Sequence, residues 1–405
     1  MLIKFSVQNF KGIKENQTLD LTANFGDEYL ETICHHDDIK INLCSCLVGP
    51  NGSGKTHILK AIFSFVSSIK DINTISNAHD PFLLDKKSNN ENNPTVYEAL
   101  LYNKKNNFIY EYSFSTKNGN IINENLDIKE NKKNSRKKNI FKRDDLNITF
   151  NRSFGTEGNV IKSLLTKKGL FLSYTKGLDI EHINFIHEWS QSVLYFSARQ
   201  ANLSTKQLIS KFEQINHSEK DDDKIGDLKA VLEILTSKLK LFRLPIDKIS
   251  LEQDETGKYS CQITHKGLNG EKLILSWEKA QYFLSEGTYN TINITLLILI
   301  GGLNSALLLL DEYDNNLHHG LSVAILKLIR ELNSNCRSQA IITSHDVMIL
   351  DEGFRRDSIF LIDKDPELMT TSINKLSDYS LRKDSKISFK YLNDEFGATP
   401  KILDN

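Results

Sequence analysis

Residues 47 to 56 of this 405-residue chain are Leu47-Val48-Gly49-Pro50-Asn51-Gly52-Ser53-Gly54-Lys55-Thr56, which matches the pattern G-x-x-x-x-G-K-[ST] in full. Glycine has no Cβ atom, so successive backbone N–H groups can turn inward around phosphate oxygens. Lys55 supplies a cation for the β- and γ-phosphates, and Thr56 offers a hydroxyl to Mg²⁺. The segment therefore predicts a loop that binds a nucleoside triphosphate, formed by Gly49, Pro50, Asn51, Gly52, Ser53, Gly54, Lys55 and Thr56.

The residues on either side of this loop have the patterns that a phosphate-binding loop requires. Ile41 to Val48 has the length and alternation of a largely buried strand. After the loop, apolar residues recur at helical spacing, at Ile58, Leu59, Ile62, Phe63 and Val66. The order is strand, loop, helix, and the helix dipole favours an anion at its first turn. This context supports a nucleotide site over a chance glycine-rich turn.

A second group of candidate site residues lies in the last third of the chain. Leu307 to Leu310 is an apolar run that ends in the carboxylates of Asp311 and Glu312. This is the pattern of a buried parallel strand, and an open α/β sheet places its site where such strands end. We expect Asp311 to hold Mg²⁺ through water and Glu312 to polarise the attacking water. Residues 340 to 346 form another apolar strand whose end carries His345, which would sense the γ-phosphate.

A short polar string precedes these strands. Leu284-Ser285-Glu286-Gly287-Thr288 stands at the head of an apolar helix. A serine and a glycine at a helix N-terminus form a small anion receptor, because the hydroxyl, the bare N–H groups and the dipole point the same way. Taken alone, the string is only a helix cap. Its position before Asp311 makes Ser285 and Gly287 candidate nucleotide ligands.

The strings LSEGT, LLLLDE and TSHD, in this order, resemble the ATP-binding-cassette (ABC) ATPases, specifically the branch with RecF, the SMC-like proteins and the OLD-type ATPases. The resemblance implies an α/β fold: an ABC/SMC-like P-loop ATPase core with an antiparallel β subdomain and an inserted helical region. It implies ATP and Mg²⁺ as cofactors, Thr56 and Asp311 at the metal, and Glu312 and His345 as catalytic residues. In that family the serine-glycine signature closes over the nucleotide of a second copy. We therefore expect a homodimer or higher homo-oligomer with shared ATP sites.

Two weaker parts of the resemblance concern the first half of the chain. Asn9-Phe10-Lys11 resembles the opening of that family, which suggests that Lys11 approaches the nucleotide. The glutamine loop of the family has no clear counterpart, and Gln200 is the candidate for it.

The C-terminal region narrows the resemblance to a branch. Four segments of this region resemble the small ATPases of bacterial abortive-infection and anti-phage systems, which include the ATPase subunit of PARIS and retron-linked relatives. The four segments are Arg356 to Asp365, Leu376 to Tyr379, Lys390 to Leu392 and Phe396 to Pro400. The chain departs from these relatives at two places. His319 stands where they commonly have proline, and Asn393-Asp394-Glu395 replaces their Gly-Arg.

The resemblance implies an ATP-hydrolysing sensor or switch of an anti-phage system. Such a protein controls a separate toxic effector, here expected to be a nuclease, in response to a nucleic acid or a phage protein. The alternative is a RecF/SMC-like ATPase that binds DNA in repair or genome maintenance. A self-contained nuclease is a third hypothesis, because Asp363-Lys364-Asp365 superficially offers the D-x-D of a Toprim centre. Only a short tail follows that string, so we interpret it as the last strand of the ATPase and its cap. The identity of the neighbouring open reading frame would distinguish a role in anti-phage defence from a role in DNA repair.

Composition and sequence pattern argue against several other classes of protein. The chain has 39% hydrophobic residues, enough for a substantial core, and a net charge of −1, which gives no bulk attraction to nucleic acid or membrane. The start of the chain reads as a strand and not as a signal peptide, and five scattered cysteines favour a reducing cytoplasm. Cys34-His35-His36 with Cys44 and Cys46 could be metal ligands, although the spacing fits core cysteines better. The longest apolar stretch, Ile292 to Leu310, fits a buried helix and strand better than a membrane span.

Patterning divides the chain into three parts. Residues 1–160 form an N-terminal ATPase lobe with a β-rich subdomain, whose strands include Val96 to Tyr102, Phe108 to Ser115 and Asn120 to Ile128. Residues 161–245 turn helical, with apolar stripes at Leu203 to Ile215 and Leu228 to Leu239. These stripes are either a helical arm or two core helices. Residues 246–405 form the C-terminal ATPase lobe.

A run of basic residues, Lys129 to Asn139, ends near Lys142 and Arg143. It is either a solvated hairpin tip or a contact for a polyanion, since clustered cations gain affinity by releasing counterions.

Overall fold

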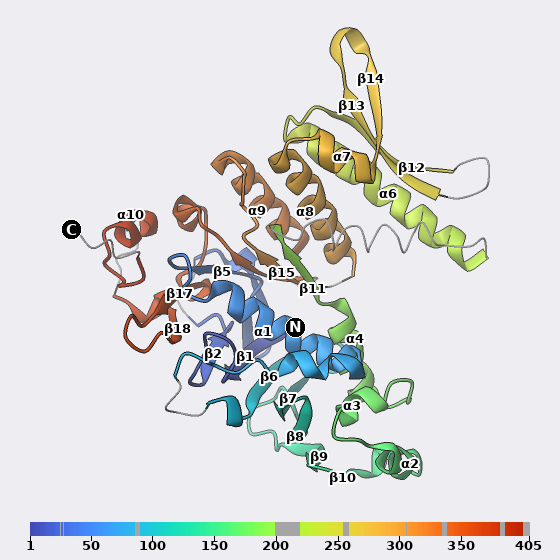
Figure 1. Cartoon of the computed structure of the whole chain (residues 1–405), viewed down its shortest axis with the longest axis vertical. Coiled ribbons are helices and arrows are strands. Elements are labelled where there is room, and N and C mark those ends of the chain that lie inside the picture. Colours follow the sequence, from blue (N-terminus) through green and yellow to red (C-terminus); the bar gives the residue numbers. More distant parts are fainter. Residues whose placement is uncertain are drawn as a thin grey trace.

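The computed structural model describes residues 1–24, 26, 28–85, 90–198, 219–253, 259–304, 306–333, 338–380 and 385–399; for 219–224 it describes the backbone only. Two sheets form the body of the molecule (Figure 1). The larger sheet is antiparallel, in the order β10-β9-β8-β7-β6-β1-β2. Its strands are β1 (Leu2–Gln8), β2 (Gln17–Asp20), β6 (Thr95–Asn103), β7 (Phe108–Lys117), β8 (Asn120–Glu130), β9 (Lys138–Asp144) and β10 (Asn147–Phe150).

The second sheet carries the phosphate-binding loop and has the order β11-β15-β16-β5-β17-β18. All neighbours in it are parallel except β17 and β18. Its strands are β5 (Cys44–Val48), β11 (Leu194–Ser197), β15 (Leu307–Asp311), β16 (Gln339–Thr343), β17 (Ile359–Lys364) and β18 (Thr371–Lys375). The chain therefore has an α/β fold, with a mixed, mainly parallel sheet and an antiparallel sheet.

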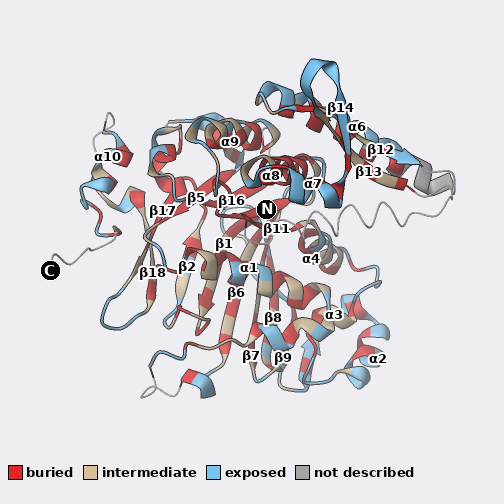
Figure 2. Cartoon of the chain, turned by 45° about the horizontal axis from the view of Figure 1, so that its top comes forward, coloured by how far each residue is buried: buried red, intermediate tan, exposed pale blue. Residues whose placement is uncertain are grey.

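Alternation along the parallel strands builds two cores on opposite faces of this sheet. Leu307 and Leu309 join the core that contains α1 (Lys55–Lys70) and the antiparallel sheet. Leu308 and Leu310 join the other core, together with α8 (Glu286–Leu303) and α9 (His319–Asn333). Figure 2 shows the buried residues concentrated in this central sheet. Both faces must be apolar, which is why these strands read as continuous hydrophobic runs.

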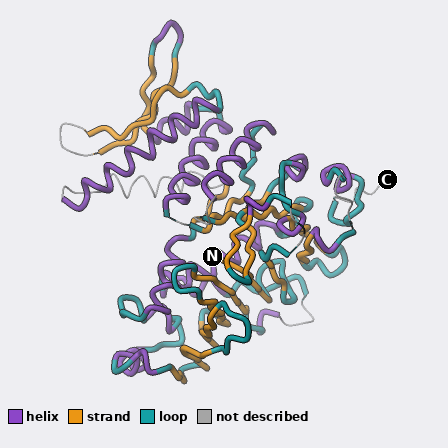
Figure 3. The backbone as a smooth tube through the Cα atoms, turned by 180° about the vertical axis from the view of Figure 1, so that it is seen from behind, coloured by secondary structure: helices purple, strands orange, loops and turns teal. Residues whose placement is uncertain are grey.

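A smaller antiparallel sheet stands apart from this body. It consists of β12 (Ile246–Gln253), β13 (Tyr259–Lys266) and β14 (Lys272–Ser276), and it packs on α6 (Glu219–Leu241) and α7 (Trp277–Phe283). Figures 1 and 3 show the β13–β14 hairpin projecting away from the body. The apolar stripe of α6 is buried, so α6 is a core helix; its members are Leu228, Val231, Leu232, Leu235 and Leu239. The stripe predicted at 203–215 lies outside the described residues.

The remaining helices and strands complete the arrangement. They are β3 (Ile33–His36), β4 (Ile39–Asn42), α2 (Glu157–Leu164), α3 (Phe171–Tyr174), α4 (Glu181–Ser192) and α10 (Ile387–Leu392). Helices α2 to α4 pack on the core of the antiparallel sheet, whereas β11, which follows them, is a strand of the parallel sheet. The predicted region 161–245 thus contributes to both cores, and its treatment as a separate part stays a prediction. Among the described helices, none combines the length and the apolar composition needed to cross a bilayer.

Most predicted strands are confirmed, with one correction. The strand at the start of the chain, the three strands of the β-rich region, and the helix and strand within 292–310 are all present. The single strand predicted for Ile41 to Val48 is wrong, because the chain changes sheet at Leu43. Asn42 pairs with Ile33 in the β3–β4 hairpin, and Cys44 pairs with Ala340 in the parallel sheet.

The basic run also needs a correction at its end. Arg143 is fully buried, and its guanidinium donates to the carbonyl oxygens of Asp145, Thr166 and Gly169 at 2.5 to 2.7 Å. It also lies 3.6 Å from the carboxylate of Glu124, which is itself buried. Burial raises the pKa of Glu124, and the charge of Arg143 opposes that shift. Arg143 is therefore a structural cation that ties β9 to the 166–169 loop.

Arg143→Ala should lower the free energy of unfolding by about 3–5 kcal/mol, because it leaves the carboxylate of Glu124 buried without its counter-ion. Lys142→Ala is the matched control, since Lys142 is exposed on the same strand and should change stability by less than about 0.5 kcal/mol. Urea unfolding of both variants measures the difference. Equal losses would contradict the structural role of Arg143.

Candidate functional site

The phosphate-binding loop joins β5 to α1, as the sequence predicts. Gly49 lies against β17, where an added Cβ would stand 2.0 Å from the carbonyl oxygen of Ile362. Gly54 precedes α1 with a φ of 110°, a conformation that L side chains rarely adopt. The loop therefore requires glycine at both positions, at Gly49 because of the close approach to β17, and at Gly54 because of its backbone conformation and an added Cβ that would stand 2.3 Å from Oγ1 of Thr371.

The N-terminus of α1 fits an anion. It has no side-chain cap and no acidic residue in its first turn, so its N–H groups are left for a ligand. The ammonium of Lys55 is almost buried and donates to the carbonyl oxygens of Gly49 and Pro50, at 2.7 and 3.1 Å. Desolvation lowers the pKa of Lys55. A phosphate would supply the counter-charge that two carbonyl dipoles replace only in part.

Asp311 joins the loop to the second group of predicted residues. Its Oδ1 accepts hydrogen bonds from the hydroxyls of Thr56 and Thr343, at 3.1 and 2.9 Å. Its Oδ2 accepts from the hydroxyl of Tyr195 at 3.4 Å. Burial raises the pKa of Asp311, while the bonds from Thr343 and Thr56 lower it. A carboxylate beside a threonine hydroxyl is a hard oxygen donor set, which fits Mg²⁺.

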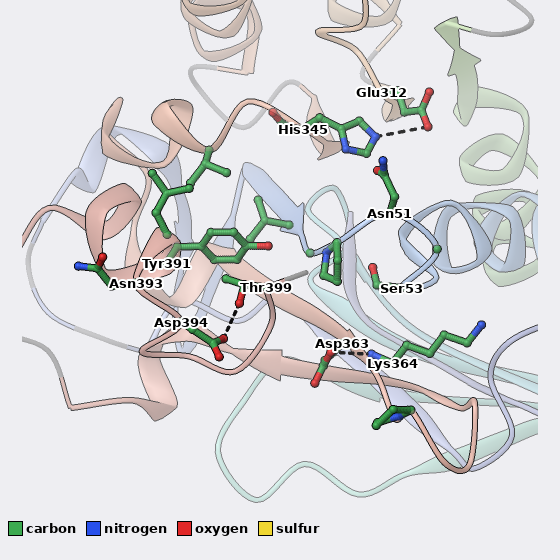
Figure 4. A pocket seen from close by; sticks show the side chains of 18 of the residues that line it. Asn51, Ser53, Glu312, His345, Asp363, Lys364, Tyr391, Asn393, Asp394 and Thr399 are labelled. Carbon is green, nitrogen blue, oxygen red and sulfur yellow. Dashed lines mark hydrogen bonds and ion pairs between the residues drawn. The ribbon is translucent and has the colours of Figure 1, made fainter. Parts of the chain in front are cut away.

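Glu312 and His345 come together at the ends of adjacent strands. Nε2 of His345 lies 3.5 Å from Oε1 of Glu312. The backbone N–H of Glu312 donates to the hydroxyl of Thr343 at 2.7 Å. Glu312 has a φ of 50°, a left-handed conformation that costs a non-glycine residue of order 1–3 kcal/mol and clusters at functional sites. Figure 4 shows Glu312 and His345 together, with Asn51 of the loop beside them.

Asn51, Glu312 and His345 line one open cavity of about 1430 Å³. The predicted residues among its lining are Gly49, Pro50, Asn51, Gly52, Ser53, Glu312 and His345. The opposite wall comes from the C-terminal segment, including Tyr391, Asn393 and Asp394 (Figure 4). Helix α10 of this segment is anchored by Asp351, which accepts from the backbone N–H groups of Ile387 and Ser388 at 2.7 and 3.2 Å. The sequence did not predict that this wall faces the phosphate-binding loop.

Asp314 is a further residue that sequence reasoning missed. Its buried carboxylate accepts from the hydroxyl of Ser344 at 2.6 Å and from the N–H groups of His345 and Asp346 at 3.2 and 2.9 Å. Three donors on one carboxylate fix the turn that carries His345. The available signal was the position of Asp314, three residues after Asp311, but nothing in the sequence indicates its partners.

Ser285 and Gly287 are not part of this cavity. Ser285 caps α8, since its hydroxyl accepts from the N–H of Thr288 at 3.3 Å, and its side chain is exposed. An added Cβ at Gly287 would stand 2.5 Å from the carbonyl oxygen of Asn316, in the loop that follows Glu312. Helix α8 therefore packs at Gly287 against the loop that contains Asn316, and Ser285 at its N-terminus is exposed.

Three further residues named from the resemblance have other placements. The ammonium of Lys11 is paired with the carboxylate of Asp80, and Lys11 does not line the cavity. His319 begins α9 and its Nδ1 lies 2.5 Å from the carboxylate of Asp346, next to the turn of His345. Gln200 lies outside the described residues. Of the cysteines named as metal candidates, Cys34 lies on β3 in the β3–β4 hairpin, whereas Cys44 and Cys46 are buried on β5 of the parallel sheet.

Asp314→Ala should lower the free energy of unfolding by about 1–3 kcal/mol or more, because buried donors at residues 344–346 lose their acceptor. It should also reduce ATP turnover, since His345 loses its fixed position. Lys327→Ala is the control, at an exposed position of α9 that does not line the cavity. Thermal unfolding and steady-state ATPase are the measurements. If Lys327→Ala lowered both as much, the positioning role of Asp314 would be wrong.

Similarity to a solved Smc head domain shows that the chain has the α/β fold of the ABC/SMC-like P-loop ATPases. The Smc head domain with a coiled coil and joint from Pyrococcus yayanosii is similar at 11% identity and a TM-score of 0.51, over 97% of this chain and 99% of that one. An Smc head bound to the C-terminal winged-helix domain of ScpA gives 13% identity and a TM-score of 0.46, over 94% and 98%. RecF bound to ATP gives 15% identity and a TM-score of 0.34, over 92% and 97%.

A search of curated proteins found no match. A family model described as "AAA domain, putative AbiEii toxin, Type IV TA system" matches residues 44–351, which run from the first residue of β5 to the aspartate that anchors α10. The match includes the phosphate-binding loop, Ser285, Asp311, Glu312 and His345. The chain therefore belongs to this family of AAA-domain P-loop ATPases.

Proposed function

We propose that this protein binds ATP with Mg²⁺, hydrolyses ATP, and uses the cycle as a switch. The observation that carries the proposal is the carboxylate of Asp311, which accepts bonds from Thr56 of the phosphate-binding loop and from Thr343 beside Glu312. One side chain thus connects the nucleotide-binding loop to the candidate catalytic residues. Family membership and fold support the same chemistry.

Each residue has a defined role in this proposal. The N–H groups of the loop and the ammonium of Lys55 bind the phosphates. Thr56 and Asp311 hold Mg²⁺, which when bound neutralises charge on the β- and γ-phosphates. Glu312 orients the attacking water, and His345, within 3.5 Å of Glu312, contacts the γ-phosphate.

We further propose that two copies share each ATP site. Ser285 is exposed at the N-terminus of an 18-residue helix and does not line the cavity of its own chain. An exposed helix N-terminus with a serine hydroxyl can bind an anion, so Ser285 and Gly287 would complete the site of a second protomer. Closure of the dimer on ATP, and opening after hydrolysis, would give the two states of the switch.

The biological role follows from the family and the resemblance. We propose that the protein is the sensor of an abortive-infection type defence system and controls a separate toxic effector, a nuclease. The family description, which names a toxin of type IV toxin–antitoxin systems, supports this context. The RecF/SMC-like role in DNA repair shares the fold, and the gene beside this one distinguishes the two: a nuclease gene supports defence and a recombination gene supports repair.

Glu312→Gln should keep ATP and Mg²⁺ bound while slowing turnover by at least tenfold, because it removes the group that orients water and leaves the loop intact. Lys55→Ala should instead weaken ATP binding. Steady-state ATPase and fluorescent-nucleotide binding separate the two effects. Wild-type turnover in Glu312→Gln would show that Glu312 is not the catalytic carboxylate.

Mixing two inactive variants tests the shared site. Lys55→Ala leaves a good Ser285 face, and Ser285→Arg leaves a good phosphate-binding loop, so a mixed dimer can assemble one complete site. We expect each variant alone to be inactive and the mixture to recover part of the ATPase. Thr288→Ala is a control that removes the bond from the Ser285 hydroxyl to the Thr288 hydroxyl and keeps the backbone cap, so it should cost no more than about 1 kcal/mol of stability with little loss of turnover. No recovery on mixing, with Ser285→Arg still dimerising on ATP, would rule out the shared site.

A further inference from the structure

The tip of the β8–β9 hairpin borders a groove that shares no residue with the nucleotide cavity. The groove has a volume of about 450 Å³ and is formed by the first residue of β7, the ends of β8 and β9, the tip between them, and α4. The base of the tip is fixed, because the buried Asn131 donates its backbone N–H to the carbonyl oxygen of Asn107 at 2.8 Å and its side-chain amide to Asn107 Oδ1 at 3.1 Å. The groove is therefore part of the folded sheet.

Positive charge is concentrated in this groove. Its lining carries five cations, Lys129, Lys132, Lys133, Arg136 and Lys138, and one anion, Glu130. Lys132 is paired with Glu130 at 2.8 Å. The other four cations are exposed and have no ion-pair partner among the described residues. The whole chain has a net charge of −1, so this excess is a local feature that favours a polyanion.

Other carboxylates near the groove are already engaged. Glu181, beside His182, accepts from the amide of Asn106 at 2.9 Å, and Asp37 accepts from Asn107 at 2.9 Å. Lys137 is directed away from the groove, toward Glu111 at 2.7 Å and Asp127 at 3.7 Å. The groove thus keeps its four unpaired cations although the hairpin as a whole carries both signs of charge.

Two aromatic rings line the groove, which the sequence did not indicate. The rings of Phe108 and His182 lie 5.2 Å apart between centroids, and both side chains are only partly buried. The ring of His182 is held by the hydroxyl of Tyr110 at 3.0 Å from Nδ1. Aromatic faces beside cations are the combination on which unpaired bases stack while phosphates meet lysine and arginine. An acidic peptide would use the cations and not the rings.

We propose that this groove binds single-stranded nucleic acid, with phosphates at Lys133, Arg136 and Lys138 and a base on Phe108 and His182. Bases that are stacked inside a duplex have no free face to place on these rings, so an unpaired segment is required. The inference deepens the proposed function, because it names the chemistry of the trigger and the place where it binds. Binding is measured without nucleotide, so its failure is distinct from failure of the ATPase.

The test is fluorescence anisotropy of a labelled oligo-dT on the full chain, across a salt series. Replacing Lys133, Arg136 and Lys138 by serine should weaken binding at least tenfold and reduce the salt slope by about two. The control replaces Lys142, Lys162 and Lys168 by serine, which removes the same charge at exposed positions outside the groove. Equal behaviour of the two triple variants would overturn the proposal.

A second variant separates nucleic acid from an acidic protein. Phe108→Leu keeps an apolar side chain and should weaken oligo-dT roughly fivefold or more, while binding of a poly-glutamate peptide stays unchanged. Retention of wild-type ATPase in this variant checks that the fold is intact. Poly-glutamate binding as tight as oligo-dT, with no effect of Phe108→Leu on either, would assign the groove to an acidic partner and contradict the proposal.

Discussion

The carboxylate of Asp311 holds the candidate site together, because it accepts hydrogen bonds from three segments that lie far apart in the sequence. Thr56 belongs to the first helix, Tyr195 to β11 and Thr343 to β16. Each donor compensates part of the cost of burying the carboxylate, whose pKa burial raises. Loss of any donor would leave a less satisfied buried charge beside the loop.

The position of Asp311 depends on the two cores that cover the opposite faces of the parallel sheet. Strands β5, β15 and β16 are buried on both faces, so their ends cannot shift without disturbing one core or the other. Their carboxyl ends then present the phosphate-binding loop, Glu312 and His345 along one edge. The strained backbone of Glu312 is tolerated there because Thr343 fixes its N–H.

The edge of the sheet is connected to the C-terminal wall by a short chain of contacts. Asp314 fixes the turn of His345, and Asp346 in that turn meets His319 and caps the 3₁₀ helix Val347–Asp351. Asp351 at the end of that helix anchors α10, whose Tyr391 lines the nucleotide cavity. Residues that depart from the relatives thus have structural partners: His319 joins this chain of contacts, and Asp394 bonds Thr399 in the wall.

Local pattern alone determined much of this protein. The glycine spacing at Gly49 to Gly54 predicts the phosphate-binding loop. The apolar runs before Asp311 and His345 predict the central strands and the site residues that follow them. These features depend on backbone conformation or on the burial of adjacent residues, so they can be seen in the local sequence. The tertiary structure decided which distant groups meet. Asp314 under His345, the C-terminal wall and the buried Arg143 depend on side-chain contacts across large sequence separations, which no local period encodes. The aromatic lining of the basic groove arose in the same way, since Phe108 and His182 become neighbours only when α4 packs on the sheet.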